Sequence, residues 1–390
     1  MTIFNRAERV HVYILHNAVR DMFKNRVFFF FSYTNMNTRS NRNSRSTNRT
    51  VSMRTSAKSK TKSYSSTNYK TNNNNTANTA NSAGSILRAI EKKDYKKLEM
   101  LVKKAKKTDL RKERSIGSFT GRYVDYAAKK GLTKMTDLLM KHTNQRDKVS
   151  VRHFTPLMYA VKNDDVKMIE MLVKNHKERI ALDGTFYGES VLDIALEAKK
   201  DSTSPALELL LKSGAKPNKN PTGNMTPLQY TILSERTPDV MLSQIQTLLK
   251  YGADPKQKFV NPETHEEESS LHLLIEAEIE TQALNRNNGS HETKLRDTIK
   301  MMISKGVSIN SKSYLGVTPL VKAMYAPKGL TNTHVKLLEI LLSLGAKTTH
   351  RDKNGKTVLQ VFDEKIKAEK PNNNKETVYS KIRRLLQNSA

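Results

Sequence analysis

The sequence predicts an all-α solenoid of about seven degenerate helix–turn–helix repeats, preceded by a long basic and polar segment. Two interleaved patterns predict this fold. A helix-opening phrase recurs at intervals of 33 to 49 residues, and amphipathic helices that end in glycine lie between its copies. Each unit of such an array contributes one helix pair, and neighbouring pairs bury a continuous core between them.

The helix-opening phrase is clearest at Thr155-Pro156-Leu157. The Thr155 hydroxyl can accept a hydrogen bond from a free amide of the first turn, so it suits the N-cap position. Pro156 suits the first helical position, where its missing N–H leaves no donor unpaired. Copies of this phrase begin at positions 122, 155, 190, 226, 269, 318 and 357, and the copy at Arg122 keeps the apolar positions but has no capping side chain.

The second pattern is an apolar helix end followed directly by glycine. A glycine just beyond a helix adopts the left-handed conformation that closes the last turn. The four copies end at Gly214, Gly252, Gly306 and Gly345.

Together the phased Thr-Pro-Leu phrases and the glycine-terminated partner helices resemble the ankyrin repeat. The resemblance covers residues 85 to 388, with long spacings and weak first and last copies as departures. It implies a binding scaffold that recognises a partner protein through its concave face and its projecting turns, without catalysis. It also implies that His272, at the family's Thr-Pro-Leu-His position, bridges neighbouring turns by hydrogen bonding.

Ahead of the repeats the chain divides into two segments. Residues 1–35 alternate short apolar runs with basic residues, which fits a targeting presequence or an upstream extension with Met36 as the true start. Residues 36–84 are rich in Asn, Ser, Thr and Arg, and a disordered tail is expected because almost nothing there can be buried. Residues 1–84 hold fourteen Lys and Arg against Glu8 and Asp21, a net charge of +12.

The predicted solenoid begins with an N-terminal cap over 85–121, continues as repeats over 122–356 and ends with a C-terminal cap over 357–388. The later units are lengthened by insertions, which are expected to be loops. One stretch, from Glu263 to Glu280, has seven Glu and no Lys or Arg. It is interpreted as a solvated loop and helix face, with contact to a basic partner or to the basic tail as the alternatives.

Composition limits the functional classes. The net charge of +30 favours contact with polyanions but does not select one. The chain has no Cys, which excludes thiolate metal sites and a Cys nucleophile. No phosphate-binding glycine loop, metal-ligand spacing or catalytic pattern is found, so no enzyme activity, cofactor or metal is expected, and no run is long enough to span a bilayer.

The function predicted from the sequence is a monomeric, non-catalytic protein-interaction scaffold. The alternative is a nucleic-acid-associated protein whose basic tail makes weak, non-specific phosphate contacts. An intracellular site, cytoplasmic or nuclear, is expected. The Asn- and Lys-rich composition is similar to that of ankyrin-repeat proteins from AT-rich genomes such as amoebae and giant DNA viruses, so a viral protein acting in a host cell is one reading.

Candidate partner-binding residues lie in the turns before the helix-opening phrases. Aromatic and Arg side chains on exposed loops commonly anchor protein interfaces. The alternative is that these side chains pack between the turns and stiffen the stack. The candidates are Phe119, Arg152, His153, Phe186, Tyr187, Phe259 and Tyr314.

Overall fold

The structure is a computed structural model. It describes residues 84–389, apart from 144–153, 187–188, 199–203, 220–224, 235, 261–266, 287–288, 325, 327–328 and 370–372. The predictions for residues 1–83 therefore lie outside the described residues.

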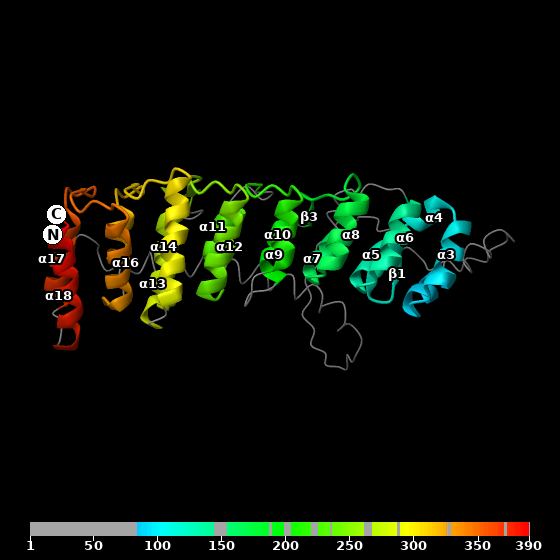
Figure 1. The fold of residues 1–390 in the computed structure, drawn as a ribbon, viewed down its shortest axis with the longest axis horizontal. Coiled ribbons are helices and arrows are strands. Elements are labelled where there is room, and N and C mark those ends of the chain that lie inside the picture. The colour runs from blue at the N-terminus through cyan, green and yellow to red at the C-terminus, as the bar shows by residue number, and fades with distance from the viewer. Residues whose placement is uncertain are drawn as a thin grey trace, which may run out of the picture.

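Helix pairs stand side by side in chain order and form one elongated row, from α3 at one end to α17 and α18 at the other (Figure 1). The first unit holds a helical stretch over 84–91, α3 (Tyr95–Lys104) and the short α4 (Lys107–Arg111). Seven inner helices follow: α5 (Tyr123–Lys129), α7 (Pro156–Lys162), α9 (Val191–Ala198), α11 (Pro227–Leu233), α13 (Ser270–Thr281), α15 (Pro319–Lys322) and α17 (Val358–Glu369). Their outer partners are α6 (Thr133–Thr143), α8 (Val166–His176), α10 (Pro205–Lys212), α12 (Pro238–Lys250), α14 (Gly289–Ser304), α16 (Asn332–Ser343) and α18 (Asn373–Asn388).

Each of the seven predicted phrase positions lies directly before an inner helix, so the predicted phase of the repeats is confirmed. Thr155 accepts a hydrogen bond from the Met158 amide at 3.3 Å, and Thr226 caps α11 in the same way at 3.2 Å. Where the capping hydroxyl is missing, at Arg122, the Asp125 carboxylate accepts from the Arg122 amide at 3.0 Å and also binds its guanidinium. The start of α5 is therefore satisfied by a carboxylate in its first turn.

The four predicted closing glycines have positive φ values: 105° at Gly214, 93° at Gly252, 94° at Gly306 and 91° at Gly345. After each one, the next amide bonds back into the helix, as Ala346 does to the Leu341 carbonyl at 3.0 Å. The outer helices α10, α12, α14 and α16 therefore end as the sequence predicts.

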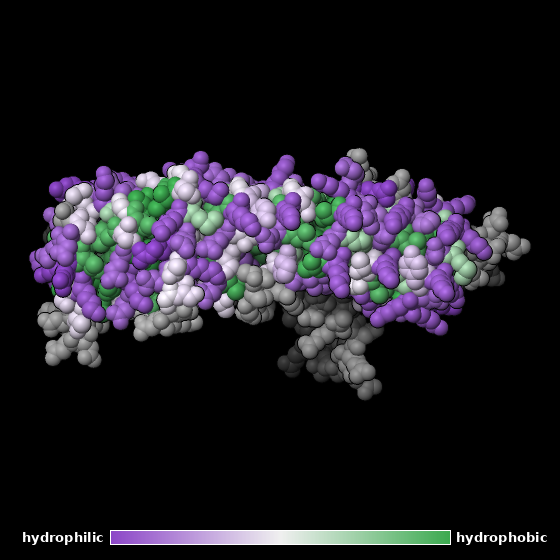
Figure 2. Space-filling model, in the orientation of Figure 1, coloured by the Kyte–Doolittle hydropathy of each residue, from purple (hydrophilic) through white to green (hydrophobic). Residues whose placement is uncertain are grey.

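One core runs the length of the row. Each inner helix contacts the next inner helix, and the outer helices contact each other in the pairs α6–α8, α8–α10, α12–α14 and α16–α18, so neighbouring units stabilise one another. The face shown in Figure 2 is mostly hydrophilic, and its hydrophobic side chains gather in small separate areas. At the C-terminal end, Tyr379, Ile382 and Leu386 of α18 are buried while Lys381, Arg383 and Arg384 are exposed, as expected for a terminal cap.

Within the described residues, three short antiparallel hairpins precede inner helices: β1 (Arg114–Ile116) with β2 (Phe119–Gly121), β3 (Thr185–Phe186) with β4 (Glu189–Ser190), and β5 (Phe259–Val260) with β6 (Glu267–Glu268). We call them fingers 1, 2 and 3. They add β structure that the helical periodicity could not indicate.

The interpretation of the acidic stretch as a solvated surface is wrong for most of its described part. Glu268 and Glu276 both pair with Lys322, at 2.8 and 3.1 Å. Glu278 is fully buried and pairs with His291. The stretch supplies internal ion pairs because its helix, α13, lies between units rather than at the surface.

Asp164 is also corrected. Asp165 caps α8 through the Met168 amide at 3.0 Å, as expected for a helix start. The sequence predicts caps at both Asp164 and Asp165 because both precede a helix, but Asp164 has a left-handed backbone with φ of 51° and accepts a hydrogen bond from Ser204 in the next unit at 2.8 Å.

Candidate partner-binding surface

The predicted contact residues occupy two different environments. Phe119 in finger 1 and Phe259 in finger 3 are only 5% and 4% exposed. Phe186 in finger 2 is half-buried, and Tyr314 is 72% exposed. Tyr187, Arg152 and His153 lie outside the described residues. Of the candidates described, Phe186 and Tyr314 keep surface that a partner could contact.

Five aromatic rings form a continuous strip across three units, which we call the aromatic strip: Tyr126, Phe119, Tyr159, Phe154 and Phe186. Successive ring centroids lie 5.3, 6.2, 5.3 and 4.4 Å apart along this order. The last pair meets edge to face at 89°, a favoured geometry for aromatic rings. The strip links finger 1, helices α5 and α7, and finger 2. Its Phe119 and Tyr126 rings are buried, and its Tyr159, Phe154 and Phe186 rings are half-buried.

Lysine ammonium groups lie over three rings of the strip. Lys129 is 5.1 Å from the ring centroid of Phe119, Lys130 is 5.5 Å from that of Tyr126, and Lys162 is 5.2 Å from that of Phe154. At these distances the cations are attracted to the negative faces of the rings. The strip therefore combines apolar area with a basic edge.

Carboxylates gather beyond Phe186. Glu189 is paired with Phe186 in the register of finger 2, and Asp193 and Glu197 follow on α9. Glu189 keeps exposed surface, but the loss of water around its carboxyl group raises its pKa to about 6. The charges of Asp193 and Glu197 act in the same direction, and Lys162 opposes them. The surface thus changes from basic to acidic within one unit.

The acidic end is partly neutralised from the next unit. Arg236 has a fully buried side chain and donates to Glu197 at 3.2 Å, and the Tyr230 hydroxyl donates to the same carboxylate at 2.6 Å. Burial, followed by the Glu197 charge, raises the pKa of Tyr230, so this hydroxyl stays protonated. These contacts fix Glu197, whereas Asp193 binds Ser190 at the start of α9.

A second exposed spot lies at finger 3. Val260 is 45% exposed in β5, and Tyr314 follows in the next turn. The Tyr314 amide donates to the Glu267 carbonyl in β6 at 3.1 Å, which brings the two residues to the same finger. The structure does not connect this spot to the aromatic strip.

The strip includes residues that were not among the predicted contact residues, which were all taken from the turns. Tyr126 and Tyr159 occupy the fifth position of the recurring phrase, as does Tyr230 further on. This recurrence could have identified these tyrosines from the sequence, because a given position of the repeat faces the same side of the solenoid in every unit. Phe154 and Glu189 had no comparable signal, since each is placed by its own turn.

His272 makes the bridge that the resemblance implied. Its Nε2 lies 2.9 Å from the Val317 carbonyl of the next unit, and its Nδ1 lies 2.7 Å from the Ser269 hydroxyl. Burial lowers the ring pKa, so the ring is neutral and serves as a structural link between units.

Within the described residues, no group of three His, Asp or Glu side chains is arranged to hold a metal ion. No helix of this part of the chain is both long enough and apolar enough to cross a membrane.

Comparison with known proteins supports the repeat assignment. Ankyrin repeats, in three copies, match residues 124–221. No curated protein matches the chain. Similar solved structures include an ankyrin repeat domain from Acinetobacter baumannii, with 22% identity over 60% of this chain and 97% of that one and a TM-score of 0.42.

Two further structures show comparable similarity. The ankyrin repeat domain of Bcl-3, a member of the IkappaB family, is 17% identical over 61% of this chain and 92% of its own, with a TM-score of 0.45. The human ASB11 ankyrin repeat domain is 18% identical over 61% and 90%, with a TM-score of 0.38. The family match, which falls on helix pairs that the structure places in phase, identifies residues 124–221 as ankyrin repeats.

Proposed function

We propose that this protein is a non-catalytic scaffold that binds a partner protein across fingers 1 and 2 and the inner helices between them. Ankyrin repeats are generally protein-interaction modules. The observation that carries the proposal is the aromatic strip, which offers half-buried rings beside lysines at one end and carboxylates at the other. Aromatic anchors surrounded by charged groups are typical of protein interfaces.

Phe186 is the proposed contact residue of this surface, and Tyr314, at the separate spot on finger 3, is proposed as a second contact outside it. The buried Phe119 and Phe259 hold fingers 1 and 3 in place. Glu189 favours a partner with a basic group at this position, because such a group would relieve the repulsion among Glu189, Asp193 and Glu197. No described residue favours the nucleic-acid alternative, and its basic arm lies outside the described residues.

The test is affinity capture from lysate with the full chain, with and without nuclease. Baits are the wild type, Phe186→Ser, Tyr314→Ser and, as a matched control, Tyr95→Ser, an exposed tyrosine on α3 far along the row. We expect a discrete protein to be retained by the wild type and the control after nuclease treatment, and to be lost from at least one finger variant.

Two results would contradict the proposal. Equal retention by all four baits would show that neither finger residue contacts the partner. Capture that disappears with nuclease would show that charge-mediated nucleic-acid binding accounts for the interaction.

A further inference from the structure

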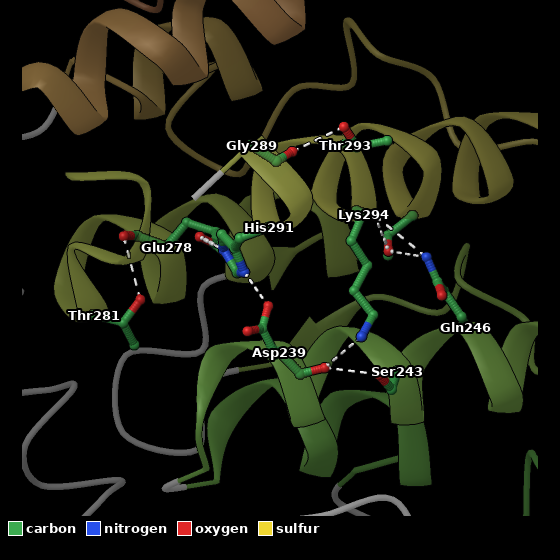
Figure 3. Close-up of polar contacts among 10 residues, drawn as sticks. Asp239, Ser243, Gln246, Glu278, Thr281, Gly289, His291, Thr293 and Lys294 are labelled. Atoms are coloured by element: carbon green, nitrogen blue, oxygen red, sulfur yellow. Dashed lines mark hydrogen bonds and ion pairs between the residues drawn. The ribbon is translucent and has the colours of Figure 1, made fainter. Parts of the chain in front are cut away.

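A charged cluster joins three helices of the fifth and sixth units, at the helix ends opposite the fingers (Figure 3). His291, in the first turn of α14, has a side chain that is only 3% exposed. Its Nδ1 lies 2.7 Å from Asp239 of α12, and its Nε2 lies 2.9 Å from Glu278 of α13. Ionised carboxylates only accept hydrogen bonds, so the ring can satisfy both only when both nitrogens carry a proton.

The helices themselves do not favour these charges. Glu278 lies in the last turn of α13, where the helix dipole disfavours an anion. His291 lies in the first turn of α14, where the dipole of that helix disfavours a cation. Glu278 is fully buried, and its second oxygen, Oε1, has no hydrogen-bond partner among the described residues. Each of these two charges is therefore stabilised chiefly by the other.

Two other charged groups of α14 lie near the cluster, and each has its own partner. Lys294 of α14 donates to the Asp239 backbone carbonyl at 3.0 Å (Figure 3). Glu292 of α14 pairs with Arg296 at 3.5 Å and with Lys336 of α16 at 3.9 Å. His291 therefore faces two carboxylates, and within the described residues no other cation forms an ion pair with either of them.

The cluster closes an irregular junction. Between α13 and α14 the chain forms a short 3-10 helix, η1 (Ala283–Arg286), in place of the tight turn of the shorter units. The far side of this junction is tied to α16, where Lys336 donates to the Leu284 carbonyl at 3.0 Å and Thr331 donates to the Gln282 side chain at 3.0 Å. Glu278 and His291 hold the two helix ends on either side of η1.

We propose that the Asp239–His291–Glu278 bridge is a proton-operated latch on the α13–α14 junction. With the imidazole ring doubly protonated, the bridge joins α12, α13 and α14. When the ring loses a proton, one carboxylate faces an unprotonated nitrogen, and the buried Glu278 charge loses its cation. The junction around η1 then opens, while the helix pairs on either side stay folded.

The direction of the pH response follows from the contacts. Burial alone would lower the pKa of His291, but hydrogen bonding and charge from Glu278, then from Asp239, raise it above the ordinary value of 6.5. A group whose pKa is raised by folding stabilises the folded form below its unfolded pKa, and that contribution is lost as the pH rises through the folded pKa. The latch is therefore closed at acidic pH and opens as the pH rises through the raised pKa of His291.

The first test is an NMR titration of the full chain with isotope-labelled histidines. The His291 ring signal is identified by its loss in His291→Gln. We expect a ring pKa above 6.5 for His291, and values below 6.5 for His176 and His272, whose ring pKa burial lowers. These two buried histidines are internal controls. A His291 pKa at or below 6.5 would refute the latch.

The second test is hydrogen exchange of residues 275–295 across the same pH range, corrected for the intrinsic exchange rate. The opening equilibrium constant should rise tenfold for each unit by which the His291 pKa exceeds 6.5, since proton binding and opening are linked. Unchanged opening through the titration would overturn the proposal even if the ring pKa is raised.

Two carboxamide variants separate the latch from a general effect of charge. Asp239→Asn should lower the His291 pKa and shift the opening to lower pH. The side chain of Asp239 is 55% exposed, so this variant is expected to fold. Asp297→Asn is the matched control, because Asp297 is 54% exposed on α14 and pairs with Lys300 instead. Equal effects of the two substitutions would show that the bridge has no specific role.

Discussion

Lys322 shows how one buried charge organises its surroundings. Its side chain is 10% exposed, and its ammonium group contacts Glu268 of β6 and Glu276 of α13. Burial alone would lower the pKa of Lys322, but the charges of Glu276 and Glu268 raise it. The lysine therefore remains charged and ties α15 to the previous unit and its finger.

We expect Lys322→Met to lower the free energy of unfolding by about 3–5 kcal/mol, because it leaves two carboxylates close together without a cation. Denaturation by urea, followed by circular dichroism, measures the change. The triple variant with Glu268→Gln and Glu276→Gln should recover most of the loss, because it removes the unpaired charges as well. A cost below about 1 kcal/mol for the single variant would mean that water screens the cluster.

At the scale of single elements, the glycine closures set where the outer helices end. Gly345 has a φ of 91°, and a Cβ atom added there would meet no atom within 4 Å. The Cβ of an alanine at this position therefore clashes with nothing. Any loss in the free energy of unfolding comes from the backbone conformation alone.

Gly345→Ala should lower the free energy of unfolding by about 1–2 kcal/mol, the cost of holding an L-residue in the left-handed region. Gly289→Ala is the matched control, since its added Cβ is also unobstructed and its φ is not positive. Thermal unfolding of both variants measures the difference. Equal effects would show that the glycine conformation does not determine the helix end.

At the scale of the whole molecule, each unit depends on contacts with its neighbours for its stability. The last pair, α17 and α18, covers α15 and α16 and gives water a charged outer surface. A defect placed there should weaken the nearest units first, because distant units share no contacts with it.

Ile382→Asp places a charge in the fully buried face of α18 and should open the C-terminal units. Hydrogen exchange should rise at least tenfold in α17 and α18, while α5 and α7 keep their protection. Lys381→Asp, one residue away on the exposed face, is the control and should leave exchange unchanged. Uniform loss of protection along the chain would mean that the array unfolds as one cooperative unit.

The repeat phase could be predicted because its determinants are local. A Thr or Ser before six of the seven inner helices and a Gly after four of the outer helices act within a few residues of themselves. Even His272, whose partner is Val317, was predictable through the family pattern. The structure confirms these features with little adjustment.

The polar clusters could not be predicted, because their partners lie far apart in the chain. Asp239 meets His291 across 52 residues, and Glu268 meets Lys322 across 54. In the sequence, the glutamates of the acidic stretch are indistinguishable from solvated ones. Their pairing depends on how insertions of unequal length bring the units together, which periodicity does not encode. The same holds for Phe154 and Phe186, which meet only when α7 and finger 2 are stacked.

The chain contains fourteen Tyr and no Trp, and two of the tyrosines, Tyr126 and Tyr159, lie in the aromatic strip. Burial, with the Asp125 charge, raises the pKa of Tyr159 to about 12, so this phenol stays un-ionised and emissive at ordinary pH. Any indole emission in a mixture must then come from the partner. Resonance energy transfer from these phenols to a partner tryptophan would report docking on the strip without any added dye.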